Sequence, residues 1–551
     1  MSESLVESLS SMENGFFANA RRAPDAIALD FGDVRVPYGE LAERARRVSA
    51  TLAGLAPGGG DVGKWVGVWC GKTVAAYAGI LGILHAGRGY VPIAETAPAG
   101  RIAECLSRAA AATLVVDQTT LAALDDLLAL VDRPLDVVVL AGDEGALAML
   151  AARHARHRFP VLAAAAPDRI ETRVNRDEPA YLMFTSGSTG RPKGVVVTHA
   201  NVRFFLDDVR RHYDFGPADR FTQFFDFTFD LSVFDIFVCL EAGGCLCPMS
   251  HQDRLFAARY MRRAKPTVWF SVPSFIHALK AARQLKPGAW PDLRWSLFCG
   301  EALTYGAARD WMAAAPNART ENLYGPTEVT IACTRFRIEP EVAAVADTAG
   351  IVPIGTAHPG HICRIVDPAG NAVDAGATGE LLIAGPQVSL GYLDDPDEQR
   401  LRFVEPPESG LRFYRTGDLV RLDNATSGLC FVGRADTQVK IRGYRIELGE
   451  VEVALRRVFP GKRVVALAVE RRPGWASLVA VIEQTHPGDE MAMPRLRQQL
   501  SNFLPDYMLP DEFAFVPSMP HNANGKIDRK ALRAGLEDAT PETGSAGSPG
   551  L

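Results

Sequence analysis

Long apolar runs are missing from this 551-residue chain. A membrane-spanning helix needs about 18 or more consecutive apolar residues, but the longest candidate, residues 73–84, is interrupted by glycine and ends at His85. We predict a buried helix there instead. The amino-terminal sequence MSESLVESLSSMENG is polar and acidic and lacks the basic and apolar regions of a secretory signal. We therefore expect a cytoplasmic protein with no membrane partner.

Cysteine pairs with metal-binding spacing are also missing. The nine cysteines include no C-x-x-C, and the closest pair is Cys245 and Cys247. An odd number of cysteines without a disulfide framework predicts reduced thiols, and the lack of C-x-x-C pairs argues against a zinc site. Lys plus Arg number 59 and Asp plus Glu number 65, a formal charge of −6. The chain thus lacks the excess of positive charge that is typical of nucleic-acid-binding proteins.

Alternating helical and strand-like segments fill the first part of the chain. Residues 36–165 alternate helical stretches at 41–55 and 74–85 with short apolar runs at 66–69, 113–116 and 136–140. This pattern is typical of βαβ units with parallel sheets, and so of an α/β fold. Further apolar runs at 181–184, 195–198, 267–270 and 293–298 are expected to add strands of the same kind.

The pattern changes after about residue 360. Short strand-like runs with Gly and Pro turns, at 362–366, 379–384 and 428–432, predict a distorted, β-barrel-like unit. We expect a large amino-terminal domain over 1–434 for substrate and ATP, followed by a small mobile α+β lid domain over 435–536. The remaining residues, 537–551, are rich in Pro, Gly, Ser and Thr and are predicted to be a disordered tail.

The strongest local signal is the loop TSGSTGRPKG (185–194), which lies between the apolar runs YLMF and VVVT. Glycines let backbone N–H groups close around a phosphate, hydroxyls add donors, and Lys193 adds a compact positive charge. The loop does not match G-x-x-x-x-G-K-[ST], which disfavours a P-loop NTPase. The alternative is a mobile Ser/Gly hairpin.

The segment YLMFTSGSTGRPKGVVVTHAN (181–201) resembles the phosphate loop of the adenylate-forming superfamily of acyl- and aryl-CoA synthetases and luciferases. It is most similar to the amino-acid adenylation domains of nonribosomal peptide synthesis. The resemblance continues in family order through LHAGRGYVPI (84–93), FDLSVFDIF (229–237), NLYGPTE (322–328), GELLIAGPQVSLGYL (379–393), YRTGDL (414–419), GRADTQVKIRGYRIELGEVE (433–452), LPDYMLP (504–510) and NGKIDRKAL (524–532). It implies an ATP-dependent ligase that forms aminoacyl-AMP and then a carrier-protein thioester, as in antibiotic biosynthesis.

The resemblance also implies roles at the ATP site. Lys526 would bridge the substrate carboxylate and AMP, Thr327 would contact the α-phosphate, and Glu328 would hold Mg²⁺. Tyr324 would stack on adenine and Asp418 would accept hydrogen bonds from the ribose. The implied ATP- and phosphate-binding residues are Thr185, Ser186, Gly187, Ser188, Thr189, Gly190, Lys193, Gly300, Glu301, Ala302, Asn322, Tyr324, Gly325, Asp418 and Arg434.

A second half-reaction follows from the same resemblance. Asp436 would be the hinge about which the small domain rotates, and the face around Gly443 would then turn inward for attack by a phosphopantetheine thiol. The chain shows neither a condensation domain nor a carrier domain, so we expect the acceptor to be a separate carrier protein acting in trans.

One carboxylate marks the substrate pocket. The family's specificity positions fall on Asp230, Leu231, Phe234, Phe270, Leu297, Cys299, Leu323, Ile331, Ala332 and Lys526. A lone carboxylate in an apolar wall is costly to bury, and a substrate ammonium would compensate it; the alternative role of Asp230 is to cap the helix that follows. Two phenylalanines leave little room, which predicts a small apolar α-amino acid, alanine first, with glycine or serine tolerated.

Other substrates and functions are open at this point. The pocket also resembles that of prolyl-AMP ligases, and FCGE (298–301) resembles D-alanine–carrier-protein ligases, so chirality is undecided. An acyl-CoA ligase using free coenzyme A is a second hypothesis, against which Asp230 argues. A catalytically silent nucleotide-binding protein is a third.

Overall fold

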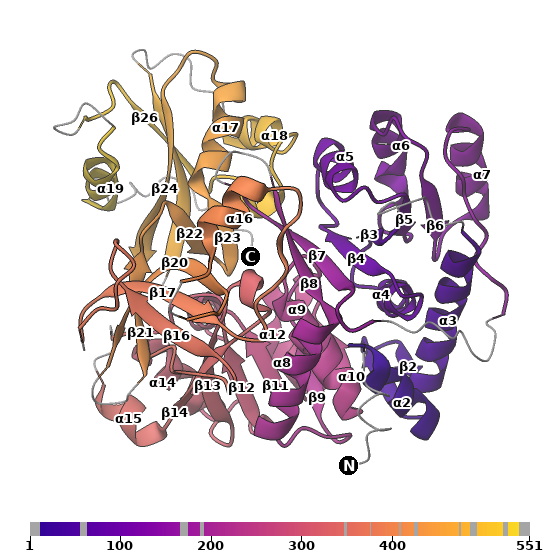
Figure 1. The fold of residues 1–551 in the computed structure, drawn as a ribbon, viewed down its shortest axis with the longest axis horizontal. Helices are drawn as coiled ribbons and strands as arrows, with labels where there is room; N and C mark the ends of the chain where they lie inside the picture. Colours follow the sequence, from indigo (N-terminus) through magenta and orange to yellow (C-terminus); the bar gives the residue numbers. More distant parts are fainter. Residues whose placement is uncertain are drawn as a thin grey trace.

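The structure, a computed structural model, describes residues 11–55, 63–165, 175–187, 192–346, 350–374, 376–406, 409–423, 428–472, 475–484, 493–521 and 527–538. The two largest sheets, of nine and seven strands, are surrounded by helices (Figure 1). The predicted buried helix is α4 (Val74–His85), which begins where the Thr73 hydroxyl accepts a hydrogen bond from the Ala76 N–H at 3.2 Å. That contact satisfies one of the free N–H groups of the first helical turn.

The first sheet has seven strands in the order β18-β8-β7-β4-β3-β5-β6. They are β3 (Trp65–Trp69), β4 (Gly89–Ile93), β5 (Thr113–Val116), β6 (Asp136–Val139), β7 (Pro179–Thr185), β8 (Lys193–Thr198) and β18 (Gly391–Tyr392). The parallel pairing expected from the βαβ pattern holds for β3 to β7. It is wrong for β7 and β8, which pair antiparallel. The loop between them is too short for the crossover that parallel strands need.

The second sheet has nine strands in the order β15-β14-β13-β12-β11-β9-β10-β1-β2. Its parallel centre comprises β1 (Ile27–Asp30), β9 (Arg220–Gln223), β10 (Cys245–Pro248), β11 (Val268–Ser271), β12 (Trp295–Phe298) and β13 (Arg319–Tyr324). Antiparallel strands β2 (Arg35–Pro37), β14 (Thr334–Ile338) and β15 (Thr356–Ala357) close its edges.

Alternate residues along a strand pack into two separate hydrophobic cores. On β3, Val66 and Val68 join a core that includes α3 (Tyr38–Gly54), α4 and the nine-stranded sheet, whereas Trp65 and Trp69 join a second core with α5 (Ala99–Arg108) and α6 (Leu121–Leu130). This is the period of two expected of a strand that is buried on both faces. The other helices are α2 (Asn14–Arg22), α7 (Glu144–Arg153), α8 (His199–His212), α9 (Leu231–Val233), α10 (Cys239–Ala242), α11 (His251–Leu255), α12 (Ala257–Ala264), α13 (Pro273–Ala281), α14 (Tyr305–Ala314), α15 (Pro340–Val345) and α16 (Pro396–Arg402).

The predicted β-rich unit is an antiparallel sheet, in agreement with the sequence pattern. Its strands are β16 (Ile362–Val366), β17 (Gly379–Ala384), β19 (Phe403–Val404), β20 (Phe413–Leu422) and β21 (Leu429–Arg434). Figure 1 shows this sheet beside the nine-stranded sheet and below the carboxy-terminal part.

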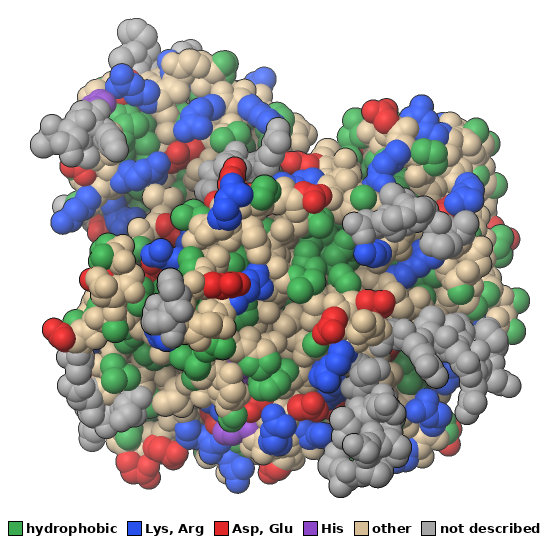
Figure 2. All heavy atoms as spheres, in the orientation of Figure 1, with side chains coloured by type: hydrophobic (Ala, Val, Ile, Leu, Met, Phe, Trp, Pro, Cys, Tyr) green, Lys and Arg blue, Asp and Glu red, His purple; other side chains and the backbone are tan. Residues whose placement is uncertain are grey.

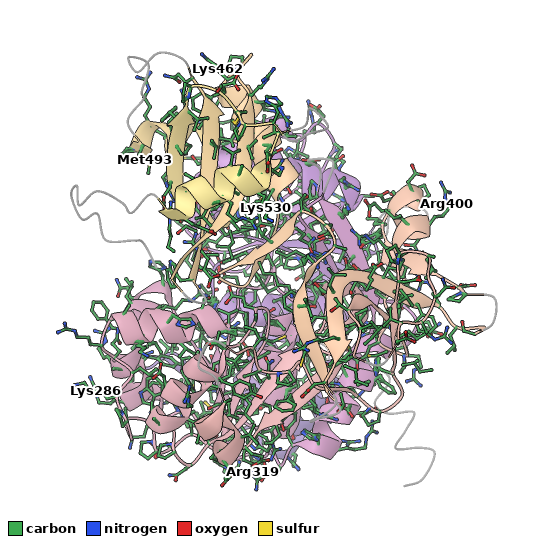
Figure 3. All side chains as sticks on the ribbon, turned by 90° about the vertical axis from the view of Figure 1, so that its left-hand side faces the viewer. Lys286, Arg319, Arg400, Lys462, Met493 and Lys530 are labelled. Carbon is green, nitrogen blue, oxygen red and sulfur yellow. The ribbon has the colours of Figure 1, made fainter. Side chains whose placement is uncertain are left out.

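The carboxy-terminal part begins with a hairpin of β22 (Gln438–Ile441) and β23 (Tyr444–Glu447). It continues with α17 (Leu448–Val458), β24 (Val464–Arg472), β25 (Trp475–Glu483), α18 (Met493–Leu500), β26 (Glu512–Val516) and α19 (Arg529–Asp538). Two hydrophobic cores, one on each face of its three-stranded sheet, consist of residues from Val439 onward. Figure 3 shows α19, which carries Lys530, lying across these strands.

The domain division at residue 434 stays a prediction. Helix α19 continues to Asp538, beyond the predicted end of the small domain at residue 536, and residues 539–551 lie outside the described part of the chain. Figure 2 shows acidic and basic side chains interspersed over one face, with a notch between the carboxy-terminal part and the helices α5, α6 and α7.

Candidate functional site

The predicted pocket residues converge at the carboxyl ends of neighbouring parallel strands. Phe270 on β11 lies directly opposite Leu297 on β12. Cys299 follows β12, and Leu323 lies near the end of β13. In open parallel sheets, ligands bind outside this edge.

A cavity of about 840 Å³ lies next to this edge. It is roomy enough for a nucleotide-sized ligand. Among the residues predicted to bind ATP, its walls include Gly300, Glu301, Ala302, Asn322, Tyr324, Gly325, Asp418 and Arg434. The amide of Asn322 donates to the backbone carbonyls of Val352 and Pro353 at 3.4 and 2.9 Å, so this side chain also fixes the cavity wall.

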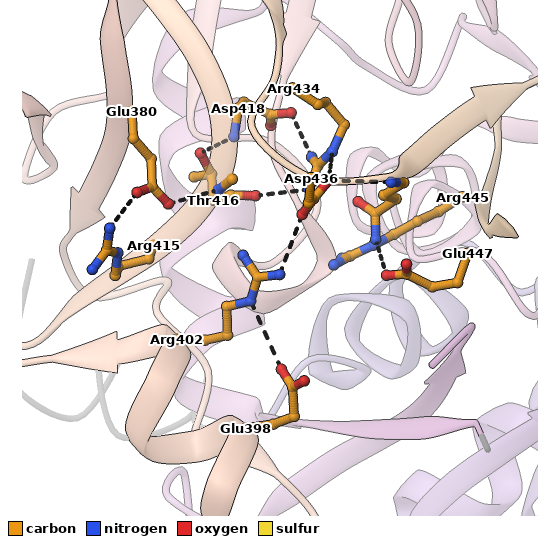
Figure 4. Close-up of polar contacts among 12 residues, drawn as sticks. Glu380, Glu398, Arg402, Arg415, Thr416, Asp418, Arg434, Asp436, Arg445 and Glu447 are labelled. Atoms are coloured by element: carbon orange, nitrogen blue, oxygen red, sulfur yellow. Dashed lines mark hydrogen bonds and ion pairs between the residues drawn. The ribbon is translucent and has the colours of Figure 1, made fainter. Parts of the chain in front are cut away.

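Charged and hydroxyl groups connect the cavity to the predicted hinge. The hydroxyl of Tyr324 donates to Asp418 at 2.6 Å, and Arg434 donates to the other oxygen of Asp418 at 2.5 Å. Arg434 also pairs with Asp436 at 2.7 Å, and Arg402 pairs with Asp436 at 3.2 Å (Figure 4). The sequence-predicted ribose, phosphate and hinge residues therefore form one network.

Asp230 is buried at the start of α9, and its side chain makes no capping hydrogen bond to that helix. It accepts the Ile331 N–H at 3.2 Å and a hydrogen bond from the Thr327 side chain. Burial raises the pKa of Asp230 to about 6, and these two hydrogen bonds oppose the shift. Within the described part of the chain, no cationic side chain forms an ion pair with it.

Aromatic rings pack together among the predicted pocket residues. Phe234 and Phe270 meet edge to face with centroids 4.7 Å apart, and Phe225 packs on Phe270 at 5.0 Å. Phe234 starts a π-helical turn, Phe234–Val238, a distortion that is frequent at functional sites. The other predicted lining residues, Leu231, Leu297, Cys299, Leu323, Ile331 and Ala332, are all at most 4% exposed.

The backbone is strained at Ile331, a predicted pocket residue, and at its neighbour Thr330. Thr330 and Ile331 have φ values of 51° and 74°, a region that β-branched residues rarely adopt. The buried Gln387 amide donates to the carbonyls of Thr330 and Ala332 at 2.8 and 2.9 Å. This brace keeps the Ile331 N–H directed at Asp230.

The described part of the predicted phosphate loop contacts other parts of the protein. The Ser186 hydroxyl donates to the Arg445 carbonyl at 2.8 Å, and the Gly187 N–H donates to Glu450 at 3.3 Å. Lys193 pairs with Glu398 at 2.8 Å. The Thr185 hydroxyl donates back to the Lys193 carbonyl; Ser188, Thr189 and Gly190 lie outside the described residues.

Glu328, the predicted magnesium ligand, is fully buried and paired with Arg445. The Arg445 guanidinium donates to both carboxylate oxygens at 2.9 and 2.8 Å, and Tyr392 donates to one of them at 2.7 Å. Burial would raise the pKa of Glu328, but Arg445 and Tyr392 lower it to about 2. Glu328 does not fit Mg²⁺ in this arrangement, because Arg445 covers its oxygens.

The β22–β23 hairpin reaches into the site. The Gly443 N–H donates to Glu301 at 2.7 Å, and Lys440 lies 5.7 Å from the centroid of the Tyr324 ring. Glu301, predicted to contact ATP, thus holds the hairpin. Lys526 lies outside the described residues. Gly443 thus faces the site, and its role in a second half-reaction stays a prediction.

Sequence reasoning missed several residues of this site. Gln387, Tyr392, Arg445 and Glu450 lie within motifs that were recognised, but nothing in their spacing specifies a partner more than 50 positions away. Phe225 precedes the recognised FDLSVFDIF segment by a few residues and could have been found only through its ring contact.

Comparison with known proteins bears on this geometry. The model for AMP-binding enzymes matches residues 16–393. The chain belongs to the AMP-binding enzyme family. It is 32% identical over 528 residues to a dimodular nonribosomal peptide synthase of Bacillus subtilis, covering 94% of this chain and 21% of that protein. The chain spans less than half of the length of the curated relatives it matches.

Solved structures agree with the family assignment. The Vibrio cholerae adenylation domain AlmE, in complex with glycyl-adenosine-5′-phosphate, is 29% identical with a TM-score of 0.84, and the match covers 95% of this chain and 97% of AlmE. Holo-PA1221, which contains adenylation and PCP domains, is 26% identical with a TM-score of 0.75, covering 95% and 84% of the two chains. This AMP-binding enzyme is thus an adenylation domain of the nonribosomal peptide synthetase type.

Two further properties of the AMP-binding enzyme concern metals and membranes. The described residues bring together no group of three or more His, Cys, Asp or Glu side chains suited to a metal ion. None of the helices in the described ranges combines the length and apolar content needed to cross a membrane.

Proposed function

We propose that this AMP-binding enzyme activates a small apolar α-amino acid, alanine first, with glycine or serine tolerated. The observation that carries this proposal is Asp230, a buried carboxylate with no cation paired to it among the described residues. Burying an unpaired carboxylate costs several kcal/mol. The ammonium group of an amino acid supplies the missing charge.

The aromatic wall supports a small side chain. Phe234 and Phe270 are each 1% exposed and pack directly on each other. A side chain much larger than that of alanine or serine would have to displace one of these rings, because protein interiors are close-packed. The glycyl-adenosine-5′-phosphate held by AlmE is consistent with a small substrate in this fold.

The chemistry is adenylation with ATP and Mg²⁺, as is general in this family. An oxygen of the amino-acid carboxylate attacks the α-phosphorus of ATP, and the bond to pyrophosphate breaks. Lys526 would bridge the carboxylate and the α-phosphate as negative charge builds there, since a cation placed at that point stabilises the transition state. Tyr324 and Asp418 would position the nucleoside.

The second step transfers the aminoacyl group to a thiol. The sulfur of a phosphopantetheine arm attacks the carbonyl carbon, and AMP leaves with the electron pair of the C–O bond. The acceptor would be a carrier protein. The inward position of Gly443 supports this step, because the same hairpin lines the 840 Å³ cavity.

Amino-acid-dependent ATP–pyrophosphate exchange tests the proposal. Wild-type enzyme should catalyse exchange with alanine, and Lys526→Ala should reduce it by at least about 100-fold, within the range for loss of one charge-stabilising group. Lys530→Ala, a matched lysine on α19 (Figure 3), should keep it. Equal exchange activity of the Lys526 and Lys530 variants would contradict the role in adenylation that is assigned to Lys526.

A further inference from the structure

The segment 223–226, at the end of β9, carries an aromatic ring whose backbone is held on both sides. Phe225 is 4% exposed and packs on Phe270 of the predicted pocket, with ring centroids 5.0 Å apart. Its N–H donates to Asp235 at 3.3 Å, and its carbonyl accepts a hydrogen bond from the Gln223 amide. Asp235 lies in the π-helical turn next to Phe234. The position of the Phe225 ring therefore depends on polar groups outside the predicted set of pocket residues.

Two further side chains hold this segment from the other large sheet. Lys72 lies between β3 and α4, and its ammonium group donates to the Phe224 carbonyl at 2.8 Å and to the Gln223 carbonyl at 3.4 Å. The same group pairs with Asp226 at 3.6 Å. Tyr77 on α4 donates its hydroxyl to the side-chain oxygen of Gln223 at 3.0 Å. The β3–α4 corner of the seven-stranded sheet thus holds a segment of the nine-stranded sheet.

The corner places a charge where charge is costly. The side chain of Lys72 is 15% exposed, and Tyr77 is 1% exposed. Taking an ammonium group out of water is unfavourable unless other oxygen atoms replace its hydration. Two carbonyls and a carboxylate do so here. A buried hydrogen-bond network of this kind makes the groups that it joins rigid, and the segment 223–226 is what it joins to the corner.

We propose that Lys72 and Tyr77 are positioning residues that limit the size of the substrate side chain. They fix the segment 223–226 against the seven-stranded sheet, and so keep the Phe225 ring packed on Phe270. The inference rests on the proposed function. When either contact is lost, the Phe225 ring gains freedom to move, and the space behind Phe270 admits a larger aliphatic side chain.

Arg254 shows why the origin of each donor matters. Its guanidinium donates to the Phe224 carbonyl at 2.7 Å and lies 4.8 Å from the centroid of the Phe224 ring. Arg254 belongs to α11, which follows β10 of the same nine-stranded sheet. It therefore supports the segment locally and still does so after the loss of Lys72. We expect the Lys72 variant to keep its fold and to lose the fixed distance between this segment and the seven-stranded sheet.

Amino-acid-dependent ATP–pyrophosphate exchange with alanine and with valine tests the proposal on the full chain. Lys72→Met and Tyr77→Phe should each raise kcat/KM for valine relative to alanine by at least about three-fold, a part of what one or two methylenes of added space supply. Lys280→Met, which removes an exposed lysine on α13, should match wild type. Tyr38→Phe removes another buried hydroxyl, which donates to the Gly244 carbonyl, and should keep the wild-type ratio even if stability falls.

A double-mutant cycle provides a readout that a merely structural role would not change. Phe225→Leu should itself raise the valine-to-alanine ratio. When Phe225→Leu is already present, Lys72→Met should change the ratio by less than about two-fold, because residues that act through one side chain are not additive. Thermal melting identifies the folded variants. If Lys72→Met does not fold, Tyr77→Phe, which loses only one hydroxyl, replaces it in the cycle.

Two results would overturn the proposal. One is a wild-type valine-to-alanine ratio in a folded Lys72 or Tyr77 variant. The other is full additivity with Phe225→Leu, which would mean that the corner does not act through that ring. Alanine-dependent exchange by the wild type would still uphold the proposed function in both cases, whereas its absence would contradict the proposed function itself.

Discussion

A Cβ atom placed on Gly443 would lie 2.4 Å from Cγ1 of Val272, closer than real side chains approach. Gly443 also has a φ of 81°, which favours glycine. Val272 precedes α13 in the large sheet's half of the site. Under the proposed function, this contact belongs to the arrangement for thioester formation.

Gly443→Ala should therefore slow thioester formation by at least about ten-fold, equivalent to roughly 1.4 kcal/mol or more, while pyrophosphate exchange falls less. Gly461→Ala is a matched control, because Gly461 has a φ of 77° but open space around its Cβ position. Single-turnover transfer from preformed aminoacyl-AMP to a thiol measures the effect. Equal slowing of thioester formation in the two variants would mean that backbone strain alone causes the effect.

Substrate capture should depend on the ionisation of Asp230. Its pKa in the free enzyme is raised to about 6, and only the carboxylate form attracts an ammonium group. As the pH falls through about 6, kcat/KM for alanine should decline by up to about ten-fold per unit, since this parameter reports the free enzyme. Asp230→Asn should have a lower and flatter profile; a profile identical to that of wild type would exclude the ammonium contact.

The aromatic wall should set the upper limit on side-chain size. Phe270→Leu shortens one ring of the Phe234–Phe270 pair and should raise kcat/KM for valine or leucine relative to alanine by about ten-fold or more, as for one or two methylenes of added space. Phe16→Leu, another buried phenylalanine, in α2, should lose stability without changing preference. Unaltered selectivity in the Phe270 variant would place the size limit elsewhere.

Gln387 should matter to both stability and binding. Gln387→Leu leaves the carbonyls of Thr330 and Ala332 without this donor and should lower the free energy of unfolding by about 1–3 kcal/mol. The Ile331 N–H would then be less well fixed on Asp230, so KM for alanine should rise. Urea unfolding and initial rates measure the two effects, and the exposed Gln498→Leu should show neither.

The sequence was sufficient where chemistry follows from a contiguous motif. The α/β class, the buried helix at α4 and the residues around the cavity follow from periodicity and from motifs in order, because local pattern determines local structure. The antiparallel β7–β8 pair was missed, since an apolar run carries no direction of pairing.

Pairings between distant segments could not be predicted. Glu328 and Glu301 were expected to face magnesium and ATP, whereas Arg445 and the Gly443 N–H hold them here. A motif assigns a residue to a site, but it does not specify which distant side chain pairs with that residue. The pairing depends on how the hairpin packs on the site, a tertiary property that spacing does not encode.

The most direct test of the central claim is ATP–pyrophosphate exchange with a panel of substrates. The panel comprises L- and D-alanine, glycine, serine, proline, leucine and propionate. Propionate is alanine without its amino group. The account predicts the highest rate with alanine, lower rates with glycine and serine, and exchange near background with leucine and propionate. Propionate as effective as alanine, or leucine as the best substrate, would contradict it.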